Sequence, residues 1–407
     1  MRRVAITGLG VVSAVGIGVE AHWRAVREGR SGTRRPTLFD PALVTVPVAA
    51  EVLDFDAERL LPNASLDILD RFSRFALVAS HEAVNDAGLA IAEEERDRAG
   101  VSIGTGIGGA GTQDVLYRRY YAEKVPRAHP LSIPRTMYSA ATSQVGMTYG
   151  LRGPSICIST ACASSGHAIG EAYEMIRAGR ADVMIAGGAD APVTVPVFKV
   201  WEAMRVLANP DDPATACRPF SRNRIGIVLG EGAGVLVLEE WERAKTRGAR
   251  IHAELAGYGA TSDAAHITAP GVHAPVRAVR MALAQGGLAP EQVQYVNAHG
   301  TGTQLNDVTE TTILREAFGA HAPKLAISST KSMVGHTMGA SGAIELVTTV
   351  LAIIHATAPP TINYSEPDPA CDLDYVPNTA RPLAIDAAIS NSFAFGGLNA
   401  VIAVRRV

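Results

Sequence analysis

The run Val4-Ala5-Ile6-Thr7-Gly8-Leu9-Gly10-Val11-Val12-Ser13 decides the fold, because its pattern returns once, far along the chain. There residues 252–256 lead into Gly257-Tyr258-Gly259-Ala260-Thr261-Ser262, with the same G-x-G-x-x-S spacing. In both places a short apolar run typical of a buried strand, at 4–7 and 252–256, meets the glycines. A pattern that recurs at this distance indicates two related structural units.

The elements expected after each glycine run also follow one order. The first copy offers a helix over 72–87, a strand over 101–106, a helix that opens on the small residues 163–166 and a strand with a double glycine over 183–188. The second copy offers the same elements over 276–285, 295–302, 339–342 and 387–397. Long repeats that alternate strand and helix imply two α/β units, which we expect at 1–250 and 251–407.

Two segments of the first unit, 30–69 and 117–152, have no expected counterpart in the second. Insertions of this kind are usually loops or helices that carry function. We therefore expect them to shape a pocket or a subunit interface.

Composition places the chain among globular proteins. Of its 407 residues, 47% are hydrophobic, 19% are charged and 39 are glycine, which excludes a disordered or fibrous chain. The formal net charge of −3 is too close to neutral for a polyanion-binding surface. Neither nucleic acid nor a membrane surface is an expected partner.

The cysteines and the apolar runs indicate a cytoplasmic protein. Four cysteines without a CxxC pair are expected to be reduced thiols. The N-terminal apolar run breaks at Gly8, before it could form a signal-peptide core. The most apolar helix expected, over 342–358, contains Glu345 and His355, so we interpret it as buried core and not as a membrane span.

Cys162 is the first candidate nucleophile. It lies in Ser159-Thr160-Ala161-Cys162-Ala163-Ser164, just before apolar residues at helical spacing, and so at the N-terminus of a helix. The unpaired amides and the dipole at a helix N-terminus favour a thiolate, so we expect the pKa of this thiol to fall below its usual ~8.5. A buried structural cysteine is the alternative, and the local sequence does not separate the two.

Two histidines follow strand-like segments. His299 lies in Asn297-Ala298-His299-Gly300-Thr301-Gly302-Thr303, and His336 ends Ser329-Thr330-Lys331-Ser332-Met333-Val334-Gly335-His336. Strand ends carry the active-site loops of α/β folds, and an imidazole there can donate a hydrogen bond to a developing oxyanion. Either histidine alone is compatible with a structural role. The repeat favours a shared site, because it puts both histidines and Cys162 at corresponding strand ends.

These residues belong to seven ordered motifs that span nearly the whole chain. The motifs are GPS (153–155), TACASS (160–165), AGGAD (186–190), VLGEGAG (228–234), AHGTGT (298–303), STKSMVGH (329–336) and NSFAFGGLNA (391–400). With them the sequence resembles the elongating, KAS I/II-like class of β-ketoacyl-[acyl-carrier-protein] synthases. The resemblance implies a thiolase-like α/β fold, in which two pseudo-symmetric αβαβα halves form a five-layered core.

The same resemblance implies a 3-oxoacyl-[acyl-carrier-protein] synthase, an acyltransferase that performs a decarboxylative Claisen condensation. Cys162 would take the acyl chain, while His299 and His336 would assist decarboxylation of the malonyl carrier and stabilise the enolate. Lys331 would tune or orient the histidines, and Glu345 would hold a hydrogen-bond network around it. For Lys331 and Glu345 the alternative is a structural salt bridge.

Further positions complete the implied site. The backbone amides of Cys162 and Phe395 would form an oxyanion hole, and Phe395 would gate an acyl pocket to which Ile107 contributes. Thr301 and Thr303 would bind the phosphopantetheine arm. The alternatives are a phenylalanine that only caps the core and threonines that only satisfy a turn.

The implied partner is an acyl carrier protein, with Arg127 and Arg205 as candidate docking residues and plain surface charge as the alternative. No cofactor or metal is expected, since the substrates ride on the 4′-phosphopantetheine of the carrier. Neither Gly8-Leu9-Gly10 nor Gly104-Thr105-Gly106 completes the dinucleotide pattern G-x-G-x-x-G, and no metal-ligand cluster is seen.

Three departures leave the pathway open. Ile225, Ala394 and Leu398 stand where housekeeping fatty-acid synthases of this class usually carry aspartate, glycine and threonine. Fatty-acid elongation by a homodimer is the main hypothesis. The alternative is the catalytic ketosynthase of a type II polyketide or polyene synthase, paired with a cysteine-less chain-length factor. Cys162 argues against a non-catalytic chain-length subunit, and the lack of a second cysteine in the final glycine loop argues against a degradative thiolase.

Overall fold

The computed structural model describes residues 1–407. Its main sheet has the strand order β11-β10-β14-β15-β9-β1-β8-β6-β4-β5, with β2 (Gly16–Ile17) beside β1. This path consists of two half-sheets, one from each half of the chain. They join where the start of β1 (Val4–Ser13) pairs antiparallel with the start of β9 (Ala253–Ser262).

Both halves present their main elements in the same chain order. The first half contains β1, α3 (Arg71–Asp86), β4 (Ala99–Gly104), α6 (Ala140–Tyr149), β5 (Ser155–Ile158), α7 (Ser164–Arg177), β6 (Val183–Asp190) and β8 (Gly232–Glu240). The second contains β9, α10 (His273–Gly286), β10 (Tyr295–Asn297), α11 (Gln304–Phe318), β11 (Ala326–Ser328), α13 (Ser341–Ile354), β14 (Ala387–Ala394) and β15 (Leu398–Arg405). The internal repeat is therefore confirmed. One expectation is corrected, because α6, inside the segment 117–152, is the counterpart of α11.

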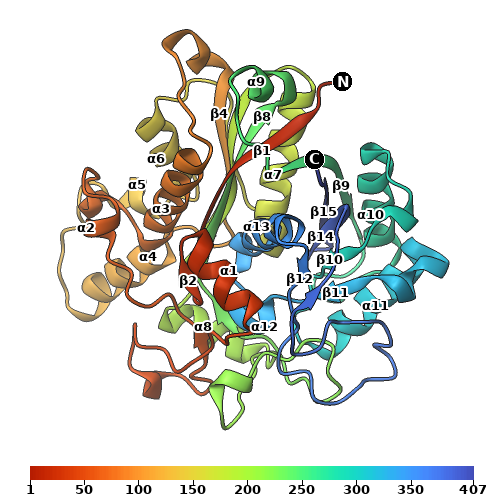
Figure 1. The fold of residues 1–407 in the computed structure, drawn as a ribbon. Coiled ribbons are helices and arrows are strands. Elements are labelled where there is room, and N and C mark those ends of the chain that lie inside the picture. The colour runs from red at the N-terminus through yellow and green to blue at the C-terminus, as the bar shows by residue number, and fades with distance from the viewer.

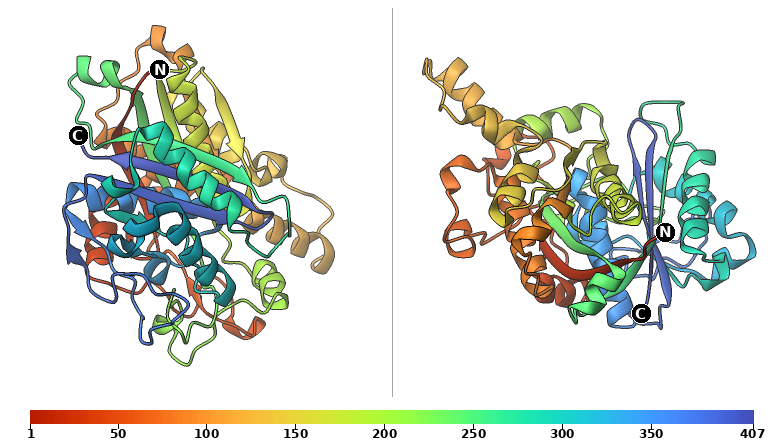
Figure 2. Two further views of the ribbon diagram at one scale, coloured as in Figure 1. Left: turned by 90° about the vertical axis from the view of Figure 1, so that its right-hand side faces the viewer. Right: turned by 90° about the horizontal axis from the view of Figure 1, so that it is seen from above.

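The half-sheets and helices form five layers. Helices α3 and α6 cover the outer face of the first half-sheet, α7 and α13 lie between the two half-sheets, and α10 and α11 cover the outer face of the second (Figures 1 and 2). Helix α13 is buried from Ser341 to Ile353 on all sides, as expected of an apolar helix covered on both faces. The α/β, five-layered thiolase-like fold is confirmed. No helix combines the length and the apolar character that crossing a membrane requires.

The paired glycines let the outer helices pack directly on the backbone of the strands. A Cβ atom on Gly8 would lie 2.0 Å from the carbonyl oxygen of Ala83, and one on Gly10 would lie 1.9 Å from that of Ala79, both in α3. The corresponding glycines of β9 would meet carbonyl oxygens of α10 at 2.0 Å. The strands also continue through these glycines to Ser13 and Ser262. The expectation that they end at residues 7 and 256 is wrong, because a glycine in a strand can mark close backbone approach as well as a turn.

The remaining short elements lie around this core. They are α1 (Val19–Arg27), β3 (Ala49–Ala50), α2 (Ala57–Leu60), α4 (Ala110–Tyr117), α5 (Ser132–Thr136), α8 (Val195–Ala203), β7 (Leu229–Gly230), α9 (Trp241–Thr246), α12 (Lys331–Val334), β12 (Thr357–Ala358) and β13 (Arg381–Pro382). Helices α2, α4 and α5 project from the outside of the first half (Figure 1). The extra chain of the first half is therefore peripheral to the layered core.

The contact between β1 and α3 predicts a position-specific cost. Replacing Gly10 by alanine forces the helix away from the strand, and we expect the free energy of unfolding to fall by about 1–3 kcal/mol. Gly111→Ala, in α4, is the matched control, because its Cβ would have its nearest neighbour at 3.6 Å and alanine favours a helix by up to ~1 kcal/mol. Thermal or denaturant unfolding of the two variants checks this. Equal stability of both variants would contradict the packing argument.

Candidate active site

Cys162 lies in a tight turn between β5 and α7. The 3-10 turn η5 (Ala161–Ala163) is entered through Ala161, whose φ of 50° lies in the left-handed region, a strained conformation for a residue with a side chain. The turn is held by Ser164, whose Oγ donates to the carbonyl of Ala161 over 2.6 Å and accepts from the amide of Thr160 over 2.9 Å. The thiol therefore lies at the N-terminus of α7, as the sequence predicts.

The second half repeats this turn before α13. There η9 (Met338–Ala340) is entered through Met338, with a φ of 53°, and Ser341 begins α13 as Ser164 begins α7. Cys162 therefore corresponds to Gly339. The alignment of the small-residue runs 163–166 and 339–342 would instead pair Cys162 with Met338, so it is wrong by one residue.

The two central helices touch at their N-termini. The amide of Ala343 donates to Ser165 Oγ over 2.9 Å, and a Cβ on Gly342 would lie 3.2 Å from the amide nitrogen of Gly166. This crossing brings the turn that holds Cys162 next to the segment that ends at His336.

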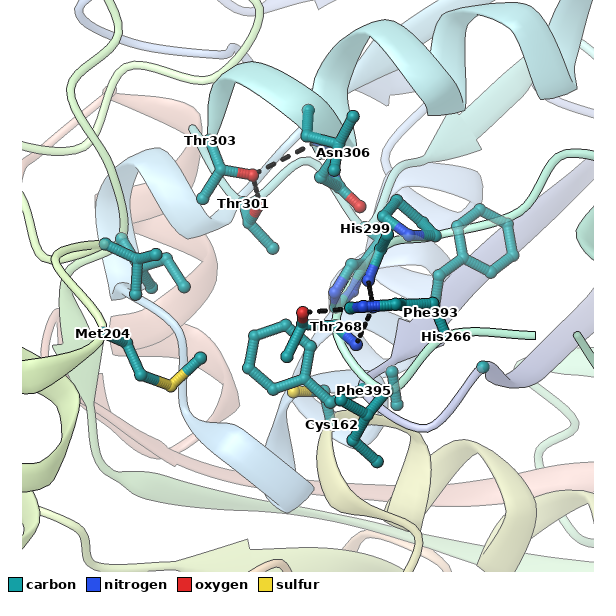
Figure 3. A pocket seen from close by; sticks show the side chains of 18 of the residues that line it. Cys162, Met204, His266, Thr268, His299, Thr301, Thr303, Asn306, Phe393 and Phe395 are labelled. Atoms are coloured by element: carbon teal, nitrogen blue, oxygen red, sulfur yellow. Dashed lines mark hydrogen bonds between the residues drawn. The ribbon is translucent and has the colours of Figure 1, made fainter. Parts of the chain in front are cut away.

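Six of the predicted residues line one cavity of about 310 Å³. They are Cys162, His299, Thr301, Thr303, His336 and Phe395. In the close-up, Cys162, His299 and Phe395 point toward the same space, and Thr301 and Thr303 lie at the start of α11 (Figure 3). Side chains from both halves of the chain thus meet around one thiol.

His299 lies two residues after the end of β10 and is held from two sides. Its amide donates to Glu310 Oε1 over 2.8 Å, and its Nδ1 lies 3.3 Å from Lys331 Nζ. Lys331 is fully buried and forms an ion pair with Glu345. Because an ammonium group only donates, Nδ1 of His299 is the acceptor and the ring hydrogen is on Nε2.

His336 does not directly follow a strand, contrary to expectation, because α12 intervenes after β11. Its Nδ1 accepts from the amide of Met338 over 3.0 Å and lies 3.1 Å from Ser341 Oγ. The backbone donor again leaves the ring hydrogen on Nε2. The two imidazole rings are perpendicular, with centroids 5.6 Å apart.

Burial and the charge of Lys331 hold both imidazoles neutral. The pKa of His299 and the pKa of His336 are each lowered well below the usual 6.5, first by burial and then by the nearby ammonium. Two neutral rings with hydrogen on Nε2 are hydrogen-bond donors at physiological pH.

The thiol behaves differently from the sequence prediction. Burial raises the pKa of Cys162 to about 12, with a further rise from Asp190, while Lys331 and the backbone amides of Phe395 and Cys162 act in the opposite direction. A helix N-terminus contributes about 0.3–1 kcal/mol, up to ~2 in favourable geometry, and one pKa unit is about 1.4 kcal/mol. Desolvation therefore outweighs the dipole, and the expectation of a lowered pKa is wrong for this closed pocket.

The amides of Phe395 and Cys162 both interact with the sulfur. The β14–β15 turn brings the first of them there through Gly396 and Gly397, whose φ values of 84° and 69° are left-handed. A Cβ on Gly397 would also lie 2.6 Å from the Cβ of Asp263. The half-buried ring of Phe395 stacks on Trp201 with centroids 5.8 Å apart.

Thr301 and Thr303 line the cavity and also satisfy their turn. Their hydroxyl oxygens lie 3.0 Å apart, and Thr303 caps α11 by accepting from the amide of Asn306 over 3.3 Å. The two roles weighed from the sequence are therefore compatible at these positions.

Five predicted residues lie outside the cavity lining: the buried pair Lys331 and Glu345 described above, and Ile107, Arg127 and Arg205. Ile107 packs in an apolar cluster with Phe198 and with Phe395, and Phe395 itself lines the cavity. Arg205 is exposed between Met204 and Val206, which line the cavity, whereas Arg127 is exposed in the segment before α5, none of which lines it.

A scan against known protein families decides the assignment. Residues 1–244 match the model "Beta-ketoacyl synthase, N-terminal domain", and residues 252–365 match "Beta-ketoacyl synthase, C-terminal domain". The chain belongs to the β-ketoacyl synthase family. Members of this family are condensing acyltransferases.

Full-length relatives of this β-ketoacyl synthase agree. The chain is 44% identical to "3-oxoacyl-[acyl-carrier-protein] synthase 2" of Synechocystis sp., covering 100% of this chain and 98% of the relative. It is 46% identical to "Nodulation protein E" of a Rhizobium sp., covering 100% of both. Among solved structures, "The ishigamide ketosynthase/chain length factor" superposes with a TM-score of 0.93 at 38% identity, covering 100% of this chain and 99% of the other.

Sequence reasoning missed two parts of this synthase's site. Glu310, fully buried in α11, accepts from the amides of His299 and Gly300 and from Asn391, and burial raises its pKa to about 7. An acidic residue on the buried face of the helix after AHGTGT was the available signal. The segment from Asp263 to Pro270 also lines the cavity, and it directly follows the second G-x-G-x-x-S run.

The raised pKa predicts how the thiol of this synthase responds to alkylation. Only the thiolate reacts, so labelling of Cys162 by iodoacetamide should rise about tenfold per pH unit from about pH 7 to 9, without a plateau. Mass spectrometry of the peptide that contains Cys162 follows the rate, with Cys162→Ala as the control for peptide assignment. A plateau near neutral pH would show that the helix N-terminus dominates after all.

Proposed function

We propose that this β-ketoacyl synthase is a 3-oxoacyl-[acyl-carrier-protein] synthase of fatty-acid elongation. It would join an acyl chain carried on Cys162 to malonyl-carrier protein by decarboxylative Claisen condensation. The observation that carries the proposal is the convergence of one thiol and two neutral Nε2–H imidazoles on one cavity. The name of the Synechocystis relative supports the carrier-bound substrate.

The first step is acyl transfer. The sulfur of Cys162 attacks the thioester carbonyl of the acyl-carrier substrate, and the carbonyl oxygen becomes negative. The amides of Cys162 and Phe395, which already face the sulfur, donate to that oxygen. The thioester bond to the carrier breaks, and the departing pantetheine thiol leaves with the proton that the cysteine gives up.

The second step is decarboxylation and condensation. The malonyl carboxylate leaves as carbon dioxide, and its electron pair forms an enolate whose oxygen accepts from Nε2 of His299 and of His336. One preorganised donor of this kind contributes about 2.7–4 kcal/mol. The enolate carbon then attacks the acyl group on Cys162, the bond to sulfur breaks, and the thiolate takes up one proton from water, which is the proton that the overall reaction consumes.

Lys331 and Glu345 act on this step through His299. The ammonium donates to Nδ1 and so fixes the ring with its hydrogen on Nε2. Its charge also keeps the pKa of the ring low. An imidazole that stays neutral can donate to the enolate without first losing a proton.

The residues that line the cavity indicate where the phosphopantetheine arm of the substrate binds. We assign Thr301 and Thr303 to the phosphopantetheine arm, because both line the cavity and keep hydroxyl groups within it. The thiol supplies the nucleophile and the histidines and amides supply the hydrogen-bond donors of the steps above, so we propose no cofactor beyond the carrier's own 4′-phosphopantetheine. We further propose units at 1–250 and 251–407, supported by the ends of the matched family segments, and a cytoplasmic location, supported by four free cysteines.

The carrier protein docks at the cavity mouth in this proposal. Arg205 is exposed there and forms no ion pair, so it is free to meet an acidic carrier. Arg205→Glu should raise KM for the carrier several-fold, by about 0.5–1 kcal/mol for a surface pair, with kcat unchanged. Arg127→Glu tests the second docking candidate in the same assay. If neither change moves KM, electrostatic docking through these arginines is wrong.

A dimer completes the proposal, and its composition separates the two pathways. Strand β5 pairs only with β4 and leaves its other edge free. In the segment before α6, four apolar or aromatic side chains are exposed by 57–75%: Tyr117, Tyr120, Tyr121 and Ile133. The ketosynthase/chain length factor structure supports the alternative, a polyketide or polyene ketosynthase with a paralogous partner. A homodimer by native mass measurement supports fatty-acid elongation, whereas a cysteine-less paralogue that copurifies supports the alternative.

Product analysis with single variants tests the reaction. Wild type, incubated with acyl-carrier donors and malonyl carrier, should form 3-oxoacyl carrier, seen by mass spectrometry. Cys162→Ala should neither gain the acyl mass nor form product, while His299→Ala and His336→Ala should still be acylated and lose about 10²–10³-fold in condensation. Identical products from wild type and Cys162→Ala would end the proposal.

A further inference from the structure

Asp190, the last residue of β6, is a fully buried carboxylate with four donors. Thr105 Oγ1 donates to it over 2.6 Å, and the amides of Gly106, Ile107 and Gly339 donate over 2.7, 3.2 and 2.6 Å. None of the steps proposed above uses this side chain. Its counterpart at the end of β14 is Ala394, so the carboxylate is peculiar to the first half.

The carboxylate holds the turn that orients His336. Gly339 belongs to η9, and its neighbour Met338 supplies the amide that binds Nδ1 of His336 over 3.0 Å. The bond from Gly339 to Asp190 ties η9 to the end of β6 across the crossing of α7 and α13. The amide of Met338 is the only backbone donor to Nδ1 of His336, and a shift of η9 would move it away from that nitrogen.

The pseudo-symmetry of the fold explains why an anion lies there. Gly339 corresponds to Cys162, whose amide faces the reactive sulfur. In the second half the corresponding amide is already occupied by the carboxylate of Asp190, and a Cβ on Gly339 would lie 2.3 Å from the amide nitrogen of Gly106. The counterpart of the nucleophile turn therefore has no room for a side chain, and it holds a resident anion.

We infer that Asp190 is a positioning residue for condensation, which holds His336 in its donor orientation through Gly339 and Met338. The inference rests on the proposed function. A charged carboxylate accepts all four hydrogen bonds, whereas an asparagine amide would turn an NH₂ group toward backbone N–H donors. Loss of the carboxylate therefore loosens η9 without touching the cavity lining.

The same charge acts on Cys162 in the opposite sense. The negative charge of Asp190 raises the pKa of the thiol, and burial raises the pKa of Asp190 itself to about 6, so it is ionised at pH 8. Removing the charge should make Cys162 react faster while condensation becomes slower. A purely structural role would slow both.

Asp190→Asn and Asp86→Asn form a matched pair. Asp86, remote from the cavity, accepts from the amide of Leu9 over 2.9 Å and binds Nε2 of His252 over 2.7 Å. In the second half the corresponding amide, that of Tyr258, donates to the side-chain oxygen Oε1 of Gln285 over 2.7 Å. An amide is therefore tolerated at this type of position. Asp86→Asn should keep wild-type kcat, KM and labelling rate.

For Asp190→Asn we expect kcat for condensation to fall about 10- to 100-fold, as for a displaced catalytic group, with KM for the carrier within about twofold of wild type. Labelling of Cys162 by iodoacetamide at pH 8 should rise by about twofold or more, since thiolate fraction follows pKa. A kcat within twofold of wild type, or a parallel loss of labelling, overturns the inference. Thermal unfolding confirms that both variants are folded.

Two further measurements cover the remaining outcomes. If Asp190→Asn does not fold, the pair Thr105→Val and Thr105→Ser replaces it. Condensation should be slower for the valine variant, whereas the serine variant should keep the wild-type kcat. Equal rates for the two variants count against the inference. If wild type forms no 3-oxoacyl product, the proposed function fails by itself. A crystal structure of Asp190→Asn then decides the positioning role, because the Met338 amide should move away from Nδ1 of His336, and an unchanged contact overturns it.

Discussion

The site depends on the close approach of two buried helices. Helices α7 and α13 begin side by side, where the amide of Ala343 binds Ser165 Oγ and a Cβ on Gly342 would lie 3.2 Å from the amide nitrogen of Gly166. Each helix is preceded by a strained turn, and these turns carry Cys162 in one half and fix His336 in the other. A larger residue at the crossing would separate the thiol from the imidazole before it changed either of them.

Desolvation sets the charge state of this site. It raises the pKa of the thiol and lowers the pKa of both imidazoles, so all three reacting groups are neutral at rest. The buried ionisable side chains around them are the ion pair Lys331–Glu345, Asp190, and Glu310, which accepts from the amide of His299. Breaking a buried ion pair costs about 3–5 kcal/mol, which makes this arrangement rigid. The negative charge of the reaction then develops on substrate oxygens that face donors already in place.

Much of this could be predicted from the sequence because it is local or repeated. The paired G-x-G-x-x-S runs predict the two-half architecture, and the motifs around Cys162, His299 and His336 predict which side chains share the cavity. Strand length could not be predicted, because a glycine in a strand and a glycine in a turn look alike until the helix beside it is known. The same holds for the pKa of Cys162 and for Glu310, since burial depends on elements far away in sequence. Ile107 shows the same limit, because which side of Phe395 it packs on is a tertiary property.

The complete burial of α13 has a consequence for how the chain reaches this state. The helix is buried around its whole circumference and packs on β8 and β1 of the first half as well as on β14 of the second. Until residue 354 has been synthesised, the inner face of the first half-sheet lacks one of its two covering helices. The emerging N-terminal part therefore exposes an apolar surface during translation until α13 covers it, and such a surface is prone to aggregation.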